Sequence, residues 1–263
     1  MSGFSAEWLA LREPADWQAR STRVVESVAR ALSKRGGIRA IDLAAGTGSN
    51  TRFLSRWVAA AEWLLVDHDV SLLERAQQAI RFGVRTRPVD LSRRSGLADL
   101  VAGHDLVTAS ALLDLVSAQW LDAVCEACWH GRAVVLFALS YDGRMTCSPE
   151  DAEDALVRTL VNRHQQRDKG FGPALGPDAT QRAAALLERL GYTVVRDRSD
   201  WVLGRESTAL QQQLLAGWAE ASIEIEPAAT TAIAGWRERR LAYAAEGRSH
   251  IVVGHEDLGA FMA

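Results

Sequence analysis

The segment AIDLAAGTGSNTRFLSRW, residues 40–57, decides the fold. An apolar run of strand length ends at Asp42, and a helical segment begins at residues 49–50. Gly46 and Gly48 lie between them, where glycine lets the backbone turn sharply and approach a ligand closely. The first turn of the following helix offers N–H groups that have no partner within the helix. The segment therefore predicts a strand, a nucleotide-binding loop and a helix in succession.

The chain after this segment continues to alternate strands and helices. Apolar runs of strand length are separated by segments of helical length, a pattern typical of crossover units in a parallel sheet with helices on both faces. The sequence therefore predicts an α/β fold with a doubly wound, mostly parallel sheet. The first five strands are expected at residues 38–44, 62–68, 83–91, 104–110 and 132–140.

Helical segments are expected before and after these strands. Residues 5–35 have helical periodicity with a break at Pro14. A helix is expected from Ser148 to the start of NRHQQRDKGFGPALGP, residues 162–177. No repeat or linker marks a domain boundary, so we predict a single domain over 1–263. The remaining expected elements are a helix over 178–190, a strand over 192–204, two helices between 206 and 246 that separate near Pro227, and a final strand over 249–258.

The composition argues against several classes of partner. The 263 residues carry 30 basic and 33 acidic side chains, a net charge of −3, without a long block of one sign. This balance disfavours a nucleic-acid or membrane surface. No stretch approaches 18 uninterrupted apolar residues and the first residues lack the features of a secretory leader, so we expect a cytoplasmic protein. Monomer and homodimer both stay open.

The three cysteines predict neither a disulfide framework nor a metal site. Cys125 and Cys128 form a C-x-x-C pair within a helical segment, and Cys147 stands alone. Residues three apart share one face of a helix, and the apolar residues around this pair favour burial. No second cysteine pair or suitably spaced histidine completes a ligand set. We therefore expect buried thiols.

The pattern Asp42-x-Ala44-x-Gly46-x-Gly48 resembles motif I of the class I S-adenosylmethionine-dependent methyltransferases. Ala44 stands where the family has a first glycine. The resemblance implies a seven-stranded sheet with an antiparallel final strand, an N-terminal helical lid and helical insertions after the fifth and sixth strands. It also implies S-adenosylmethionine as the cofactor and S-adenosylhomocysteine as its product, with the glycine loop around the methionine part of the cofactor.

Acidic residues at two further strand ends extend the resemblance. Asp67 ends the second strand in WLLVDHD, where a carboxylate can accept hydrogen bonds from both ribose hydroxyl groups, and His68 is expected beside the adenine. In RPVDLS, Asp90 matches the acid that reads the adenine amino group, and Leu91 can pack on the ring. The predicted cofactor-binding residues are Asp42, Ala44, Gly46, Gly48, Asn50, Asp67, His68, Asp90, Leu91 and Ser110.

Two alternatives remain open. The first is a nicotinamide-dependent oxidoreductase, which shares the general fold. Its fingerprint has a third glycine at the position where this chain has Thr51. The fingerprint also has no acidic residue on the strand before the loop, whereas this chain has Asp42 there. The second alternative is a module that binds the cofactor without turnover, because intact motifs indicate a cofactor site and not catalysis.

The fourth strand and its continuation, HDLVTASALLDLVS at residues 104–117, match the family's motif IV region. The segment lacks the (D/N/S)PP(Y/F) sequence of enzymes that methylate amino groups of nucleic acids, and it lacks a Pro-Cys pair for attack on cytosine. These absences and the near-neutral charge favour a small-molecule substrate. We therefore predict methyl transfer to oxygen, nitrogen or carbon of a metabolite, with positioning as most of the catalysis.

Substrate contacts are expected on the N-terminal lid, after the fourth strand and on the segment 162–177. In this segment polar side chains gather at a helix end, and loops after the fifth strand lie over the substrate half of the crevice in this architecture. Residues 1–35 are predicted as the lid, 36–140 as the cofactor-binding half and 141–263 as the substrate-side half with a helical cap. His164 is the first candidate for a general base and Tyr141 the second. The predicted substrate-binding residues are Trp8, Trp17, Asp114, Asn162, Gln165, Asp168, Lys169 and Trp201.

Overall fold

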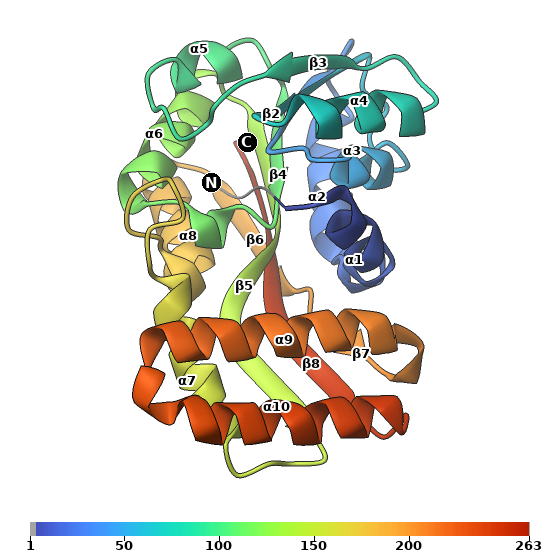
Figure 1. The fold of residues 1–263 in the computed structure, drawn as a ribbon. Helices are drawn as coiled ribbons and strands as arrows, with labels where there is room; N and C mark the ends of the chain where they lie inside the picture. The colour runs from blue at the N-terminus through green and yellow to red at the C-terminus, as the bar shows by residue number, and fades with distance from the viewer. Residues whose placement is uncertain (1–3, 263) are drawn as a thin grey trace.

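One sheet of eight strands runs through the computed structural model, which describes residues 4–262 (Figure 1). Residues 1–3 and 263, which belong to the predicted lid and substrate-side half, lie outside the described part. The order across the sheet is β3-β2-β1-β4-β5-β8-β6, and β7 pairs with β8. The strands are β1 (Arg39–Leu43), β2 (Glu62–Asp67), β3 (Arg85–Pro88), β4 (Leu106–Ser110), β5 (Val134–Ser148), β6 (Thr193–Arg198), β7 (Trp201–Leu203) and β8 (His250–Phe261).

The pairing of these strands confirms the doubly wound, mostly parallel sheet. Strands β1 to β5 pair in parallel, whereas β8 pairs antiparallel with β5, β6 and β7. The sheet has one strand more than the seven predicted, because the expected strand over 192–204 divides into β6 and β7. Between them, Ser199 donates its N–H to the carbonyl of His255, and the Asp200 carboxylate binds Arg144.

Helices cover both faces of the sheet, and the alternation of side chains along β1 shows why. Ile41 and Leu43 belong to one apolar core with α5 (Leu97–Val101), α6 (Ala118–His130) and α8 (Ala179–Arg189). Ala40 belongs to a second core on the opposite face, with α2 (Thr22–Leu32), α3 (Ser49–Leu54) and α4 (Val70–Ala79). Asp42 has the same orientation along β1 as Ala40, and it contacts α3.

The N-terminal helices divide at a different residue from the one predicted. Helix α1 spans Ala6–Ala19 and passes through Pro14, so the break expected at that proline is wrong. The ion pair between Arg12 and Asp16 joins the turns on either side of the proline. The chain turns instead at Arg20 and Ser21. Ser21 caps α2 by accepting a hydrogen bond from the N–H of Val24.

A helical cap forms the lower half of the molecule in Figure 1, where α9 (Thr208–Ile225) and α10 (Thr230–Ala245) cross β5 and β8. The prediction that β5 ends at residue 140 is wrong, because the strand continues to Ser148 through pairing with β8. Helix α7 accordingly begins at Asp154, later than predicted, and ends at Gln165. A third apolar core, including Trp236 and Leu215, holds the cap together.

Candidate functional site

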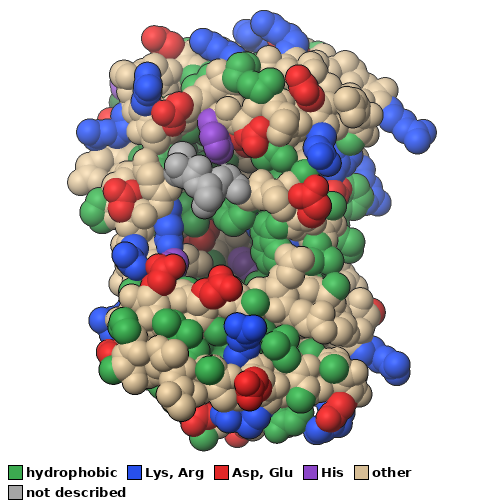
Figure 2. All heavy atoms as spheres, viewed as in Figure 1, with side chains coloured by type: hydrophobic (Ala, Val, Ile, Leu, Met, Phe, Trp, Pro, Cys, Tyr) green, Lys and Arg blue, Asp and Glu red, His purple; other side chains and the backbone are tan. Residues whose placement is uncertain are grey.

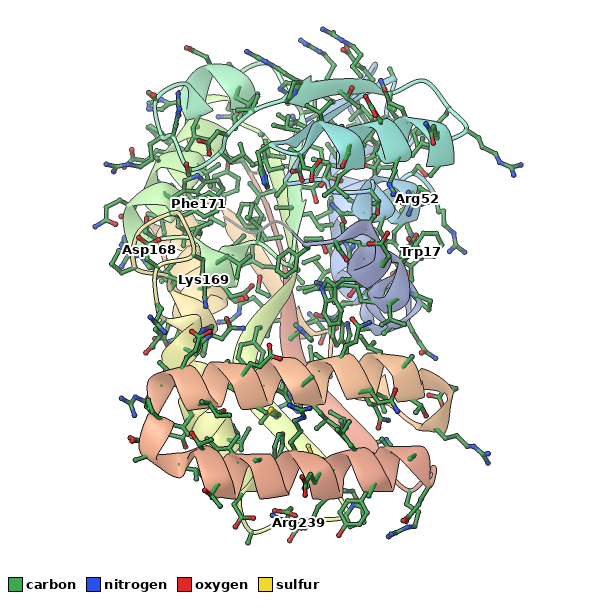
Figure 3. The ribbon with its side chains drawn as sticks, viewed as in Figure 1. Trp17, Arg52, Asp168, Lys169, Phe171 and Arg239 are labelled. Atoms are coloured by element: carbon green, nitrogen blue, oxygen red, sulfur yellow. The ribbon has the colours of Figure 1, made fainter. Side chains whose placement is uncertain are left out.

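A cavity of about 710 Å³ opens at the carboxyl ends of β1, β2 and β4. Helix α1 bounds it on one side and the segment 168–171 on the other, and Figure 3 shows Trp17 and Lys169 on these opposite sides. The surface is hollowed in the middle of the face shown in Figure 2, above the cap. Of the residues predicted for the site, the cavity is lined by Asp42, Ala44, Gly46, Asn50, Asp67, His68, Leu91, Ser110, Trp17, Asp168 and Lys169.

The glycine loop after β1 fits tightly between two helices. Gly48 caps α3 with a φ of 77°, and a Cβ atom there would lie 2.9 Å from Cδ1 of Ile80. Gly46 has a φ of 53°, and its Cβ would lie 3.0 Å from Cδ1 of Leu9 on α1. Glycine alone meets both demands without strain. Ala44 has a φ of 54°, which is the region that favours the glycine found at this position in motif I.

Asp42 is fully buried beneath this loop. Its carboxylate accepts hydrogen bonds of 2.8 Å from Nδ2 of Asn50 and of 2.8 Å from Oγ1 of Thr51. Burial raises the pKa of Asp42 to about 6, because removal from water disfavours the charged form. Thr51 stands at the position of the third glycine in the nicotinamide fingerprint. Its hydroxyl group donates to Asp42, and the fingerprint has no acidic residue at that position.

Asp67 lies at the carboxyl end of β2 and faces the cavity. Its Oδ2 accepts a 2.9 Å hydrogen bond from the N–H of Gly46, and its Oδ1 accepts one of 3.0 Å from the N–H of Asp69. Nδ1 of His68 lies 3.1 Å from the same Oδ1. The second strand is thereby fixed to the glycine loop, with an acidic group between them.

Asp90 lies beside the main cavity and outside its lining. It is exposed, and its Oδ1 accepts hydrogen bonds of 3.1 Å and 2.6 Å from the N–H and Oγ of Ser92. It lines a smaller cavity of about 360 Å³ together with Ser92, His68 and Gly170, and the last two also line the main cavity. Leu91, the next residue, is buried and does line the main cavity.

Arg20 is a lining residue that sequence reasoning did not identify. Its Nη1 donates a 2.7 Å hydrogen bond to Oδ1 of Asn50, and its Nε donates one of 3.3 Å to Asp257. Its Nη2 is buried and has no hydrogen-bond partner within residues 4–262. The only sequence signal was an arginine within the helical segment predicted over 5–35, and periodicity alone cannot distinguish it from the other arginines there.

Helix α1, which belongs to the predicted lid, contributes one of its two predicted tryptophans to the cavity. Trp17 lines it and donates a 3.0 Å hydrogen bond from Nε1 to Oγ of Ser49. Trp8 packs against the apolar core of the cap instead. Trp201 is also outside the lining, because its indole N–H donates to Asp16 at 3.0 Å and its ring lies under the Arg12 guanidinium.

The segment 162–177 divides into a part that lines the cavity and a part that lies outside it. Asp168 accepts hydrogen bonds from the N–H groups of Gly170 and Gly172 at 2.6 Å and 3.0 Å, which forms a tight turn. Phe171 packs edge-on against Trp120 with ring centroids 5.7 Å apart, and Figure 3 labels it beside Asp168. The residues from 168 to 171 line the cavity, whereas Asn162, His164 and Gln165 do not.

Neither of the predicted bases lines the cavity. The Tyr141 hydroxyl donates a 2.7 Å hydrogen bond to Oδ1 of Asn162, and burial raises its pKa well above the usual value. His164 lies behind Lys169, with Nδ1 3.0 Å from the lysine Nζ. Lys169 is therefore the titratable group of this segment that stands between His164 and the cavity.

Ser110 and Asp114, the polar residues predicted after β4, occupy different depths. Ser110 ends the strand and lines the cavity. Asp114 is buried, and its neighbours Leu112 and Leu115 line the cavity in its place. Burial raises the pKa of Asp114 to about 6, and its Oδ1 has no hydrogen-bond partner in the described part of the chain.

Features of other site classes are absent from the described residues. Cys125, Cys128 and Cys147 are buried as free thiols, and burial raises their pKa values. Between residues 4 and 262 no group of three or more His, Cys, Asp or Glu side chains could hold a metal ion. In the same range, no helix has both the length and the apolar character needed to cross a membrane.

Comparison with known proteins yields matches among solved structures. No protein-family model matches this chain, and no curated protein sequence does. The cyclopropane synthase MmaA2 from Mycobacterium tuberculosis is similar with a TM-score of 0.51 at 10% identity, over 98% of this chain and 94% of that chain. A SAM-dependent methyltransferase from Thiobacillus denitrificans, solved with S-adenosyl-L-homocysteine, has a TM-score of 0.45 at 16% identity over 99% of each chain. At such identities the likeness is one of fold.

Proposed function

From the Rossmann-like methyltransferase fold that this chain has, we propose that it transfers a methyl group from S-adenosylmethionine to a small-molecule acceptor. The observation that carries the proposal is the joint placement of the glycine loop, Asp42 and Asp67 on one cavity. These residues come from two strand ends and the loop between them, where ligands bind in open α/β sheets. The sulfonium supplies an activated methyl group, so the protein has mainly to bind and orient the two reactants.

We assign residues of the cavity to successive parts of the cofactor. Asp67 would accept hydrogen bonds from the ribose hydroxyl groups, and His68 and Leu91 would flank the adenine. At the other end, the unpartnered Nη2 of Arg20 would bind the methionine carboxylate, since a buried guanidinium N–H without an acceptor is costly. A volume of about 710 Å³ lies within the usual range for small-molecule and cofactor sites.

Asp90 would act from the adjoining cavity. Gly170 and His68 line both cavities, so an adenine amino group would approach Asp90 at the boundary where these two residues lie. Gly48 would act indirectly, by keeping the loop close to α4.

We assign the lid, cofactor-binding half and cap the roles expected from the sequence. Helix α1 and residues 168–171 would close over the bound cofactor from opposite sides. The acceptor would occupy the end of the cavity next to Arg12, Leu115, Leu139 and Lys169, where apolar and cationic side chains face the same space. Of the predicted substrate-binding residues, Trp17, Asp168 and Lys169 would contact ligands directly.

Isothermal titration calorimetry with S-adenosylhomocysteine tests the cofactor assignment, with NADH as the competing ligand. We expect saturable heat with the thioether and none with the dinucleotide, since Thr51 fills the place of the third glycine. Saturable heat with NADH alone would favour the oxidoreductase. Release of S-adenosylhomocysteine from S-adenosylmethionine across a metabolite panel then separates an enzyme from a module that only binds the cofactor.

A further inference from the structure

Three titratable side chains form a continuous chain from the cavity to the surface. Lys169 lines the cavity, and its Nζ lies 3.0 Å from Nδ1 of His164 on α7. Nε2 of His164 lies 3.3 Å from Oε2 of Glu224 on α9. The side chain of Glu224 is 60% exposed, whereas that of His164 is 22% exposed. The chain thus crosses from the cavity wall through a partly buried imidazole to solvent.

The protonation state of Lys169 sets the direction of these hydrogen bonds. When Lys169 is an ammonium it can only donate, so in that state Nδ1 of His164 accepts from Lys169 and Nε2–H donates to Glu224. An imidazole bonded in this way can accept a proton on one nitrogen and release a proton from the other. His164 therefore connects the two groups chemically as well as structurally.

Charged groups from three parts of the chain act on Lys169. Arg167 on the same segment opposes the ammonium, whereas Glu224 on α9 and Asp114 after β4 favour it. Burial nevertheless has the largest effect and lowers the pKa of Lys169, and it lowers the pKa of His164 as well. Arg167 also donates to Glu224 at 3.1 Å, which holds the outer end of the chain in place.

We propose that Lys169 removes the proton from the attacking atom of the methyl acceptor, and that His164 and Glu224 carry this proton to solvent. The proposal rests on the proposed function, and it deepens that function by naming the acceptor class: a small molecule whose nucleophilic oxygen or nitrogen carries a hydrogen. Lys169 is the catalytic base, and His164 and Glu224 act through it.

The step balances in atoms and electrons. Lys169 Nζ takes the proton of the O–H or N–H group, whose electron pair forms the bond to the methyl carbon, while the pair of the broken sulfur–carbon bond stays on sulfur. Lys169 then gives a proton to Nδ1 of His164, which releases its Nε2 proton to Glu224 and water. Lys169 returns to the free amine, while the imidazole of His164 is left with its proton on Nδ1. Proton exchange with solvent restores the Nε2–H form of His164 before the next turnover.

Because the chain has only two lysines, the pH at which the Lys169 amine loses its proton can be measured directly. Lys34 and Lys169 are the only lysines, so acetylation by acetic anhydride, read by mass spectrometry between pH 6 and 11, reports the two amines separately. We expect Lys169 to react at lower pH than Lys34. Glu224→Gln should move the Lys169 midpoint to still lower pH, because it removes a charge that favours the ammonium. Glu220→Gln, on an exposed residue of the same helix, should leave the midpoint unchanged.

The second measurement uses two probe acceptors with S-adenosylmethionine. Phenol must lose a proton on methylation, whereas N,N-dimethylaniline has none to lose. His164→Gln keeps a hydrogen-bonding side chain between Lys169 and Glu224 but cannot carry a proton through it. We expect His164→Gln to slow phenol methylation about 100-fold, the range for general-base catalysis, and to leave N,N-dimethylaniline methylation and the calorimetric affinity for S-adenosylhomocysteine unchanged.

Three results would overturn the proposed proton transfer through Lys169, His164 and Glu224. The first is an acetylation midpoint of Lys169 that equals that of Lys34 and does not change in Glu224→Gln. The others are an equal loss of methylation rate with both probes in His164→Gln, and no methylation of phenol by the parent protein. If S-adenosylhomocysteine still binds in any of these cases, the cofactor assignment stands and the proposed proton transfer alone fails. If it does not bind, the proposed function fails first.

Discussion

Trp17 donates a 3.0 Å hydrogen bond from its indole Nε1 to Oγ of Ser49, the first residue of α3. Both residues line the cavity, so this bond joins α1, the proposed lid, directly to the helix that follows the glycine loop. The Trp17 ring also packs edge-on against Phe53, with centroids 5.9 Å apart. Helix α1 and the start of α3 are therefore held together by a hydrogen bond and by aromatic packing.

The substitution Trp17→Phe tests this coupling. It keeps an aromatic ring on α1 and removes the indole N–H together with part of the ring surface. Loss of the hydrogen bond alone is worth about 1 kcal/mol for neutral groups. We expect S-adenosylhomocysteine to dissociate roughly five-fold faster, measured by stopped-flow fluorescence. Trp57→Phe is the matched control, because Trp57 is 38% exposed and outside the cavity lining. An unchanged dissociation rate in Trp17→Phe would mean that the lid does not retain the ligand.

Replacement of Asp67 by Ala should weaken binding of S-adenosylhomocysteine by about 1.5–3 kcal/mol, the scale for hydrogen bonds to a charged group. The carboxylate would lose the ribose, and the N–H of Gly46 would lose its acceptor. Calorimetry measures the change. Asp69→Ala serves as the control, since Asp69 caps α4 and should cost stability without affinity. Equal affinities for Asp67→Ala and the parent would place the ribose elsewhere.

Asp114 should make the protein less stable as the pH rises. Its folded pKa of about 6 exceeds the ordinary value of 3.8, so its contribution to stability is complete below pH 3.8 and is lost as the pH rises through 6. The difference corresponds to about 3 kcal/mol. Asp114→Asn should therefore unfold at higher temperature than the parent at pH 8 and at nearly the same temperature at pH 4. Calorimetric melting curves at both pH values measure this.

The exposed Asp99 provides the control for this experiment, because Asp99→Asn should change the melting temperature equally at the two pH values. If the melting temperature of Asp114→Asn equals that of the parent at pH 8, the buried Asp114 carboxylate must have a partner that offsets the cost of burying its charge.

Asp257 should be among the most sensitive positions of the fold. It is fully buried, and it accepts hydrogen bonds from Nε of Arg20, from the N–H of Ser21 and, at 2.8 Å, from the N–H of Leu139. Asp257→Ala leaves the buried Arg20 without its counter-ion, which should reduce the free energy of unfolding by about 3–5 kcal/mol in urea denaturation.

Asp197→Ala is the comparison for this variant. Asp197 also binds Ser21, through its hydroxyl group, but its side chain is 40% exposed. We expect a loss below about 1 kcal/mol there. Similar losses for the two variants would contradict the view that burial makes the Arg20–Asp257 pair important.

The strand, loop and helix around Asp42 could be predicted because their signals are local. A positive φ at Gly46 and Gly48, and the apolar alternation along β1, depend on residues that are close in sequence. The helical break was misplaced at Pro14 for the opposite reason. The turn at Ser21 depends on Asp257, which is distant in sequence and lies on the last strand.

The sequence by itself determined the doubly wound sheet and the set of acidic residues at its strand ends, because periodicity and glycine conformations are properties of short segments. Only the tertiary structure decided which polar residues meet. It extended β5 and β8 into the cap, brought Arg20 to the cavity, and placed Lys169 at the wall with His164 behind it. These outcomes depend on contacts between residues far apart in the chain, and such contacts leave no periodic signal in the sequence.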